Sequence, residues 1–287
     1  TRATKAFAVG TTFEVSSASG SLGLAVCSIG AGKYIVSSTD DDSVFLLTVS
    51  GTTTTKTTTL AVPDMFRRSG ITKVDNTKVI VLFLNSSYKT IAQIVNISGN
   101  ALTLGSSATS TFTNFGDFLT TPELSLTGKF YTSALILSQV DFFTEFFGLY
   151  EYSYDSVADT ITINETPKVE TSALFRATDL AYYRPTNRII ASGNANNNPV
   201  ISIIDFDTST FTPQVLNSGG TGNAGSSAID ADGDIVAVYE DNQKGVSVYG
   251  QIGDFAWLSC YSTKRWFNCK WFSICISSRS NIKHNFF

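Results

Sequence analysis

Four acidic residues in an aromatic stretch have the types and spacing that could support catalysis. They are Asp141, Glu145, Glu151 and Asp155, with phenylalanines and tyrosines between them. Hydrolysis of a glycosidic bond requires two carboxyl groups, one acting as the acid and the other as the base or nucleophile. Acids that flank aromatic residues are also typical of paired strands with one solvated face, and we favour that interpretation. We therefore assign no catalytic residue and predict that the protein is not an enzyme. A polysaccharide-degrading glycoside hydrolase using these acids is the alternative.

Nucleophilic hydrolysis is excluded more strongly, because a serine or cysteine nucleophile needs a base that titrates near neutral pH. The only histidine is His284, near the end of the chain. Cys27 is the only cysteine before residue 250, and its apolar neighbours in the sequence indicate a small core residue. A single cysteine also rules out a disulfide framework within residues 1–250.

Two acidic stretches have the oxygen-rich character of a cation-binding loop. Residues 230–234 read Asp-Ala-Asp-Gly-Asp, and residues 40–42 are three consecutive aspartates. Calcium takes carboxylate oxygens, but no glutamate lies where an EF-hand would close the first loop. Asp and Gly are also common turn residues. We interpret both stretches as turns between strands and predict no bound metal or cofactor.

Residues 251–287 differ in composition from the rest of the chain. They hold all three tryptophans and three of the four cysteines, and they carry 5 Lys+Arg against 1 Asp+Glu, whereas residues 1–250 carry 15 against 23. Cys260, Cys269, Cys275 and His284 resemble part of the CCCH zinc-finger pattern. Eight residues instead of three precede the histidine, however, and this gap is too long for that compact knuckle.

The composition break fits a tail that is translated in a shifted reading frame. Back-translating residues 254–261 with permitted codons and reading one base later gives ILLGLAVI, close to SLGLAV at residues 21–26. Residues 261–287 treated in the same way give a Ser- and Ala-rich string with no stop, which has the character of the preceding chain. We therefore predict that residues 251–287 are frame-shifted sequence rather than a second domain.

Residues 1–250 are rich in strand-forming and turn residues, which predicts an all-β fold. A unit of strand, turn, strand, tight turn and strand is clearest at residues 75–104. Five copies can be aligned on residues that lie 45, 51, 59 and 46 positions apart: Lys33, Lys78, Lys129, Arg188 and Asp234. Antiparallel β-sheet units of about 45–60 residues match four-stranded propeller blades. We predict a β-propeller of five or more blades, with a β-sandwich or a series of fibre modules as the alternative.

The repeats divide the chain into three parts. Residues 1–29 are predicted to be N-terminal strands that close the ring or link upstream, residues 30–250 to be the β-repeat body, and residues 251–287 to be the anomalous tail. Because the first residue is Thr1, we also expect the start to have been processed or to lie upstream.

The repeat at residues 75–106 resembles repeats of bacteriophage virion and tail-fibre proteins. Its pattern reads D-x-T-K-V-I-V-x-F, then an apolar strand, then I-S-G-N-x-L-T-L-G-S. The resemblance covers most of residues 30–250, loosely outside this repeat, and its motif carries no catalytic residue. It implies a structural component of a tail fibre or exterior appendage that presents a rigid β-module for assembly or host attachment.

The same resemblance implies other virion proteins as partners, together with a host-surface polysaccharide or receptor. It also implies a homo-oligomer within the extracellular particle. Nucleic acid is disfavoured, because the acidic body would repel a phosphate backbone. Membrane insertion is not expected, because no stretch approaches the ~20 consecutive apolar residues of a membrane helix.

Overall fold

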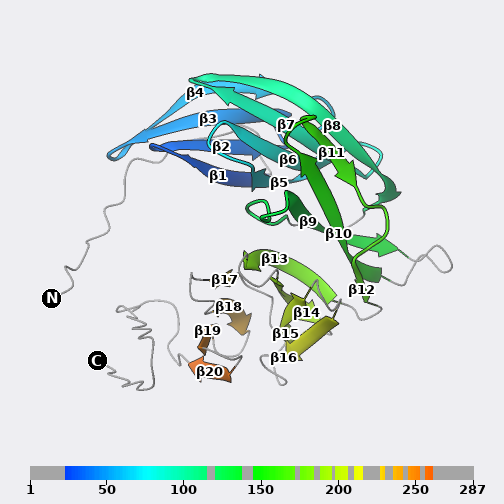
Figure 1. Ribbon diagram of the computed structural model, residues 1–287. Helices are drawn as coiled ribbons and strands as arrows, with labels where there is room; N and C mark the ends of the chain where they lie inside the picture. Colours follow the sequence, from blue (N-terminus) through cyan, green and yellow to red (C-terminus); the bar gives the residue numbers. More distant parts are fainter. Residues whose placement is uncertain are drawn as a thin grey trace.

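The computed structural model describes residues 23–114, 120–137, 145–171, 175–183, 188–195, 198–205, 210–215, 227–229, 235–241, 245–252 and 256–260. These residues form β-strands and turns only, grouped into five antiparallel sheets. No helix that could cross a membrane occurs among them. Figure 1 shows the sheets following one another around a common centre in chain order. The predicted all-β fold is confirmed.

Each sheet comes from one continuous stretch of chain. Sheet 1 contains β1 (Leu24–Gly30), β2 (Lys33–Ser38), β3 (Ser43–Ser50) and β4 (Thr53–Ala61). Sheet 2 contains β5 (Arg67–Lys73), β6 (Lys78–Leu84), β7 (Lys89–Ser98) and β8 (Ala101–Thr113). Sheet 3 contains β9 (Lys129–Leu137), β10 (Glu145–Asp155), β11 (Thr160–Ile163) and β12 (Val169–Thr171). Sheet 4 contains β13 (Phe175–Tyr183), β14 (Arg188–Ala195), β15 (Asn198–Asp205) and β16 (Thr210–Val215). Sheet 5 contains β17 (Ser227–Ile229), β18 (Ile235–Asp241), β19 (Gly245–Ile252) and β20 (Ala256–Cys260).

Sheets 1, 2, 4 and 5 are meanders in which every strand pairs with the next strand in the sequence. Short turns make this possible. Ser50 pairs with Thr53, and Ser98 pairs with Ala101, so only two residues connect the strands in each case. The first residue of each connection is a glycine with positive φ, 60° at Gly51 and 62° at Gly99. Residues other than glycine rarely adopt this backbone conformation.

Sheet 3 departs from this pattern, because β11 and β12 both pair with the same edge of β10. They act as one outer strand with a bulge between them. The Asn164 and Lys168 amides donate to Glu151 O at 2.9 Å and Leu149 O at 2.7 Å, while Pro167, which has no N–H, lies in the bulge. On the other side of β9, Thr120 forms an isolated bridge with Thr132. Sheet 3 therefore keeps the four-strand plan with its first strand reduced to a bridge.

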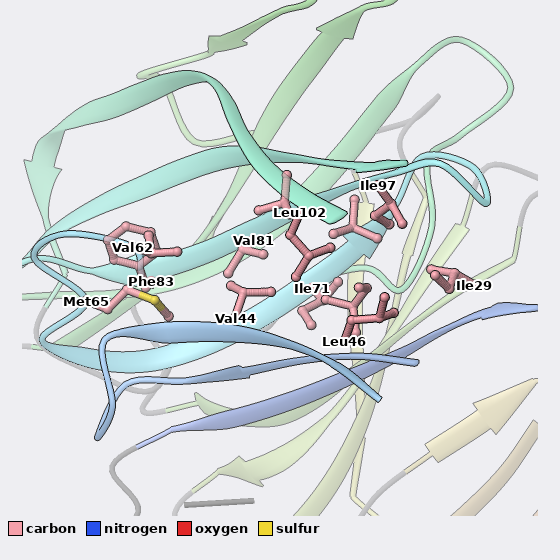
Figure 2. Packing of buried hydrophobic residues seen from close by; sticks show 13 residues of the cluster. Ile29, Val44, Leu46, Val62, Met65, Ile71, Val81, Phe83, Ile97 and Leu102 are labelled. Atoms are coloured by element: carbon pink, nitrogen blue, oxygen red, sulfur yellow. The ribbon is translucent and has the colours of Figure 1, made fainter. Parts of the chain in front are cut away.

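The central strands are buried on both faces, and their side chains alternate between neighbouring sheets. In β6, Val79, Val81 and Phe83 belong to the cluster shared with sheet 1 (Figure 2), whereas Ile80, Leu82 and Leu84 belong to the cluster shared with sheet 3. Full burial of such side chains stabilises the fold by about 1.5–3 kcal/mol each. A strand between two sheets must therefore read as a continuous apolar run.

The aromatic strand β10 follows the same rule. Tyr150, Tyr152 and Tyr154 pack in the cluster shared with sheet 2, and Leu149 packs with residues of sheet 4. Tyr152 and Leu149 have no exposed surface. The interpretation of this stretch as paired strands is confirmed, but the expected solvated face is wrong for residues 149–154, because both faces of β10 meet other sheets there.

The repeat positions predicted from the sequence fall at one place in the fold. Lys33, Lys78, Lys129 and Arg188 are the first residues of β2, β6, β9 and β14, and Asp234 lies outside the described residues. The structure places β1, part of predicted residues 1–29, inside sheet 1, and β20 of the predicted tail beside β19. The first sheet thus begins at Leu24 rather than at residue 30.

Candidate functional site

Two of the repeat lysines connect neighbouring sheets in the same way. Lys33, at the start of β2, donates from Nζ to Gly99 O at 2.9 Å and to Asn100 Oδ1 at 3.0 Å, in the β7–β8 turn of sheet 2. Lys78, at the start of β6, donates to Tyr154 OH at 3.1 Å and forms an ion pair with Asp159 in the β10–β11 turn of sheet 3. We call these contacts the lysine bridges. Each one ties the second strand of a sheet to the last turn of the following sheet.

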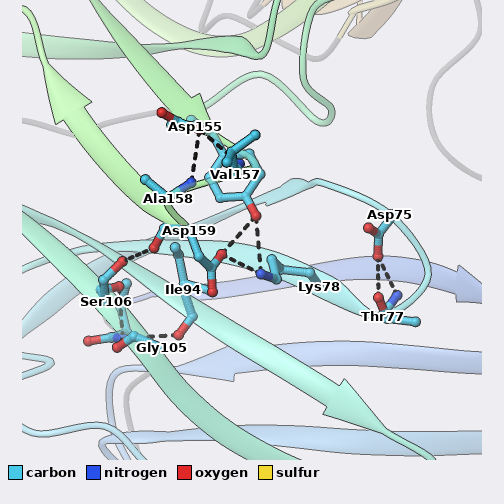
Figure 3. A network of polar contacts seen from close by, with 12 residues as sticks. Asp75, Thr77, Lys78, Ile94, Gly105, Ser106, Asp155, Val157, Ala158 and Asp159 are labelled. Carbon is cyan, nitrogen blue, oxygen red and sulfur yellow. Dashed lines mark hydrogen bonds and ion pairs between the residues drawn. The ribbon is translucent and has the colours of Figure 1, made fainter.

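The second lysine bridge is part of a wider network (Figure 3). The Tyr154 hydroxyl donates to Asp159 Oδ1 at 2.8 Å, and the Ser106 hydroxyl donates to Asp159 O at 2.5 Å. Asp155 Oδ1 accepts from the Val157 amide at 2.8 Å and from the Ala158 amide at 3.0 Å, which closes the turn that carries Asp159.

These hydrogen bonds keep the second lysine bridge charged. The hydrogen bond from Lys78, followed by the one from Tyr154, lowers the pKa of Asp159 below its ordinary value of 3.8. Burial alone would lower the pKa of Lys78, but its hydrogen bonds to Asp159 and Tyr154 outweigh burial and raise that pKa. The contact is therefore an ion pair at neutral pH.

The third repeat lysine makes a contact within its own sheet. Lys129 Nζ lies 2.8 Å from Glu151 Oε1, and the Tyr131 hydroxyl donates to Glu151 Oε2 at 3.4 Å. Tyr131 also approaches Tyr182 of sheet 4, with 6.2 Å between ring centroids. Glu151 is thus held by a cation and a phenol on the side of β10 that faces sheet 4.

Two cavities lie between sheets on the same side of the structure as the lysine bridges. The large cavity, about 560 Å³, lies between the end of β5 and the turns of sheet 3 that precede β9 and follow β10. The small cavity, about 280 Å³, lies between the end of β1 and the turns of sheet 2 that precede β6 and follow β7. The two cavities therefore occupy equivalent positions at successive junctions.

The acids proposed for hydrolysis do not form a pair among the described residues. Asp141 lies outside them, and Glu145 is described only as the first residue of β10. Glu151 and Asp155 lie on β10 four residues apart, which places their backbones about 13 Å apart. Catalytic carboxyl pairs are separated by roughly 5–9.5 Å. Glu151 instead pairs with Lys129, and Asp155 shapes a turn.

The possible metal-binding residues are placed only in part. Residues 230–234, Cys269, Cys275 and His284 lie outside the described residues, and Cys260 ends β20. In the β2–β3 turn, Asp41 Oδ2 accepts from the Ser38 hydroxyl at 3.0 Å, a contact typical of a turn. Within the described ranges no group of three or more His, Cys, Asp or Glu residues is arranged to hold a metal ion.

Cys27 packs against the hydrophobic cluster between sheets 1 and 2, as predicted for a small core residue. Burial raises the pKa of its thiol, and the nearby charge of Lys73 lowers it to a lesser extent. A thiol with a raised pKa is a poor nucleophile at neutral pH.

Comparisons with known proteins identify the fold and no family. No family model matches the chain, and no curated protein matches it. Among solved structures, hydrazine synthase from Kuenenia stuttgartiensis aligns with a TM-score of 0.56 and 12% identity, over 89% of this chain and 70% of that chain. The six-bladed β-propeller lectin of Aleuria aurantia aligns with a TM-score of 0.55 and 11% identity, over 86% and 80%. SapL1 lectin, solved with alpha methyl fucoside, aligns with a TM-score of 0.52 and 13% identity, over 84% and 82%.

The protein is a β-propeller, as these similarities and the five successive four-stranded sheets show. The sheets are its blades. The proteins that share the fold include an enzyme and lectins, so the fold alone does not assign an activity.

Sequence reasoning found the repeat lysines only as markers of periodicity and missed both cavities. The lysines that begin the second strands of sheets 1, 2 and 3 could have indicated recurring partners, because a charged residue beside an apolar run needs one; two of the three, Lys33 and Lys78, find theirs in the next blade. The cavities left no such signal, since each combines short turns from two different repeats.

Proposed function

We propose that this protein is a non-enzymatic structural component of a bacteriophage virion, in a tail fibre or exterior appendage, where its β-propeller presents a host-binding surface. The observation that carries the proposal is that residues of the phage-like repeat, 75–106, form the contacts that join sheets 1, 2 and 3. Lys78 of this repeat bridges sheets 2 and 3, and Gly99 and Asn100 receive the bridge from sheet 1. Asp75 accepts from the Thr77 amide at 2.6 Å and closes the turn before β6.

The solved structures of similar fold are compatible with a binding role. Two are lectins, one described with a fucoside bound and the other by its recognition of fucose. A propeller with a rigid frame and turns gathered on one side offers a surface on which polar contacts can be positioned. The described acids favour binding over hydrolysis, because Glu151 and Asp155 make structural contacts.

Other virion proteins are the expected partners, with the protein present as a homo-oligomer within the extracellular particle. The excess of acidic residues disfavours nucleic acid as a partner. Neither a cofactor nor a metal is part of the proposal.

Purified particles provide the direct test. Quantitative mass spectrometry should find peptides of this chain in gradient-purified virions at a fixed copy number relative to the other virion proteins. Their absence from intact particles, with the protein present elsewhere in the infected cell, would contradict the proposal.

A second assay addresses the alternative enzyme. The purified protein should bind host surface polysaccharide without producing new reducing ends. If reducing ends appear and Glu151→Gln or Glu145→Gln abolishes them, the protein is a hydrolase rather than a binding component.

A further inference from the structure

We propose that the large and small cavities are two sites for neutral sugar residues, one at each described junction between the first three blades. This inference rests on the proposed function, because it names the ligand class of the host-binding surface. The argument uses the position of the cavities, the charge of their walls and the exposed apolar side chains beside them.

The equivalent position of the cavities follows from the repeated turns. Thr77 lines the small cavity and Gly128 lines the large one, and each directly precedes a repeat lysine. The carbonyl oxygen of each accepts a hydrogen bond from a backbone amide of the third strand of its sheet. Ile97 N donates to Thr77 O at 2.7 Å beside the small cavity, and Tyr154 N donates to Gly128 O at 2.8 Å beside the large one. Repetition of the backbone thus produces repetition of the cavity.

One wall of the large cavity carries a positive and a negative side chain on backbones that are fixed relative to each other. Lys73 and Glu123 are partners in a parallel β-bridge and both line the cavity. The Lys73 amide donates to Pro122 O at 2.9 Å, and the Leu124 amide donates to Lys73 O at 3.2 Å, so the backbones that carry the two charges are fixed relative to each other. One ammonium and one carboxylate leave no net charge on this wall, which favours a neutral ligand over an anion or a cation.

The remaining walls of the large cavity suit a ligand with hydroxyl groups and an apolar face. Ser125 and Thr127 add hydroxyls that pair with each other at 3.1 Å, and Ser125 Oγ also accepts from the Lys129 amide at 2.9 Å. The Thr127 hydroxyl keeps capacity for a further hydrogen bond, and the cavity volume lies in the range of small-molecule sites. Leu126 lines the cavity although 79% of its surface is exposed, and Val157, on the adjacent β10–β11 turn, is 95% exposed. These two exposed side chains offer an apolar surface on which the C–H face of a sugar ring can pack.

The small cavity has the equivalent position with less room, and its one charged side chain, Lys33, is already hydrogen-bonded to Gly99 O and Asn100 Oδ1. Lys33 lines it together with the side chains of Asn76 and Thr77. The Asn76 side chain lies beside Gly30, where an added Cβ would make ordinary van der Waals contact with it at 3.7 Å. Its volume of about 280 Å³ lies just below the roughly 300–1,000 Å³ of small-molecule sites, so it can take only a smaller ligand than the large cavity. Two weak sites on one side of the molecule would act together on a polymer with repeating sugars.

Saturation-transfer NMR on the full chain tests the proposal with a panel of neutral methyl glycosides and with methyl glucuronide as the charged probe. Several neutral glycosides should bind with millimolar affinity, and the glucuronide should bind more weakly. Glu123→Gln and Leu126→Ser should each weaken binding of the best neutral glycoside about tenfold, because each removes one wall contact. Lys168→Gln, at a partly buried position of sheet 3 that lines neither cavity, should bind as the unchanged protein does.

Three outcomes would overturn the inference. They are the absence of binding by any glycoside, equal or tighter binding of the glucuronide, and unchanged affinity in both Glu123→Gln and Leu126→Ser. Circular dichroism of each variant must match the unchanged protein, and Leu126→Ser should satisfy this condition because the side chain is largely exposed. A protein found in purified virions that binds no glycoside would refute the sugar sites alone. A protein that is absent from virions would refute the proposed function.

Discussion

The double substitution Tyr152→Phe with Thr90→Val should make this protein more stable. The Tyr152 hydroxyl is fully buried between sheets 2 and 3, and burial raises its pKa far above the ordinary value of 10.0, so the group stays neutral. It approaches the Thr90 hydroxyl without reaching hydrogen-bond geometry, and both oxygens are buried without a partner. An unpaired buried polar group costs about 1–3 kcal/mol, whereas the replacements keep the ring and the branched side chain.

We therefore expect the double variant to gain about 2 kcal/mol in the free energy of unfolding, measured by urea denaturation, and about 4–8 °C in Tm. The matched control is Tyr154→Phe on the same strand. Its hydroxyl has partners in Lys78 and Asp159, so this change should lower stability by about 1 kcal/mol. If the double variant loses stability by as much as the control does, the two hydroxyls are satisfied and the reasoning is refuted.

Three further predictions concern the lysine bridge, a turn and the tail. Lys78→Met should lower stability by about 1 kcal/mol at pH 7, since the ion pair is partly exposed. The lowered pKa of Asp159 means that this contribution is present above about pH 4 and is lost as the pH falls through the folded-state value, so urea curves of variant and parent should converge in acid. Gly32→Ala should lower the free energy of unfolding by about 2–3 kcal/mol in the same assay, because φ is 70° and a Cβ would lie 2.6 Å from Val49 O. The control Gly51→Ala, at φ 60° with no atom within 4 Å, should lower it by about 1 kcal/mol. Equal losses in the two variants would argue against the contact with Val49. Intact-mass measurement of the native protein should disagree with the tryptophan-rich tail as written, and tail peptides that match it would end the frame-shift hypothesis.

The strands that were predicted well are those marked in the sequence by a continuous apolar run or by a glycine turn. The run from Val79 to Leu84 is continuously apolar because both faces are buried, and glycine at a two-residue turn separates β7 from β8. Together these features specify most of sheet 2 from the sequence alone.

The first strands of the sheets were harder to recognise. β5 reads RRSGITK, with only one large apolar residue, Ile71, and its first two residues are exposed. The first strand of sheet 3 is reduced to a bridge at Thr120, which leaves no strand pattern at all. Counting repeats from the second strand therefore located the blades but placed the start of the first one too late.

The candidate site was less predictable than the fold, for a related reason. The acids of β10 attracted attention because residue type suggested chemistry, yet Glu151 is committed to Lys129. The cavity that contains Lys73 and Glu123 joins residues 50 positions apart in the sequence, and only the parallel bridge brings them together. Residue types alone do not show which distant turns will meet.

Because every sheet is formed by contiguous residues, the molecule can fold progressively during synthesis, with local pairing preceding association between sheets. Sheet 2 can complete its hairpins as soon as Thr113 has left the ribosome. At that moment Ile80 and Leu82 still face water, because Phe130 and Tyr152, which cover them, have not yet emerged from the ribosome. A nascent chain that pauses there exposes an apolar sheet face, so we expect slower translation of the segment up to Tyr152 to increase aggregation.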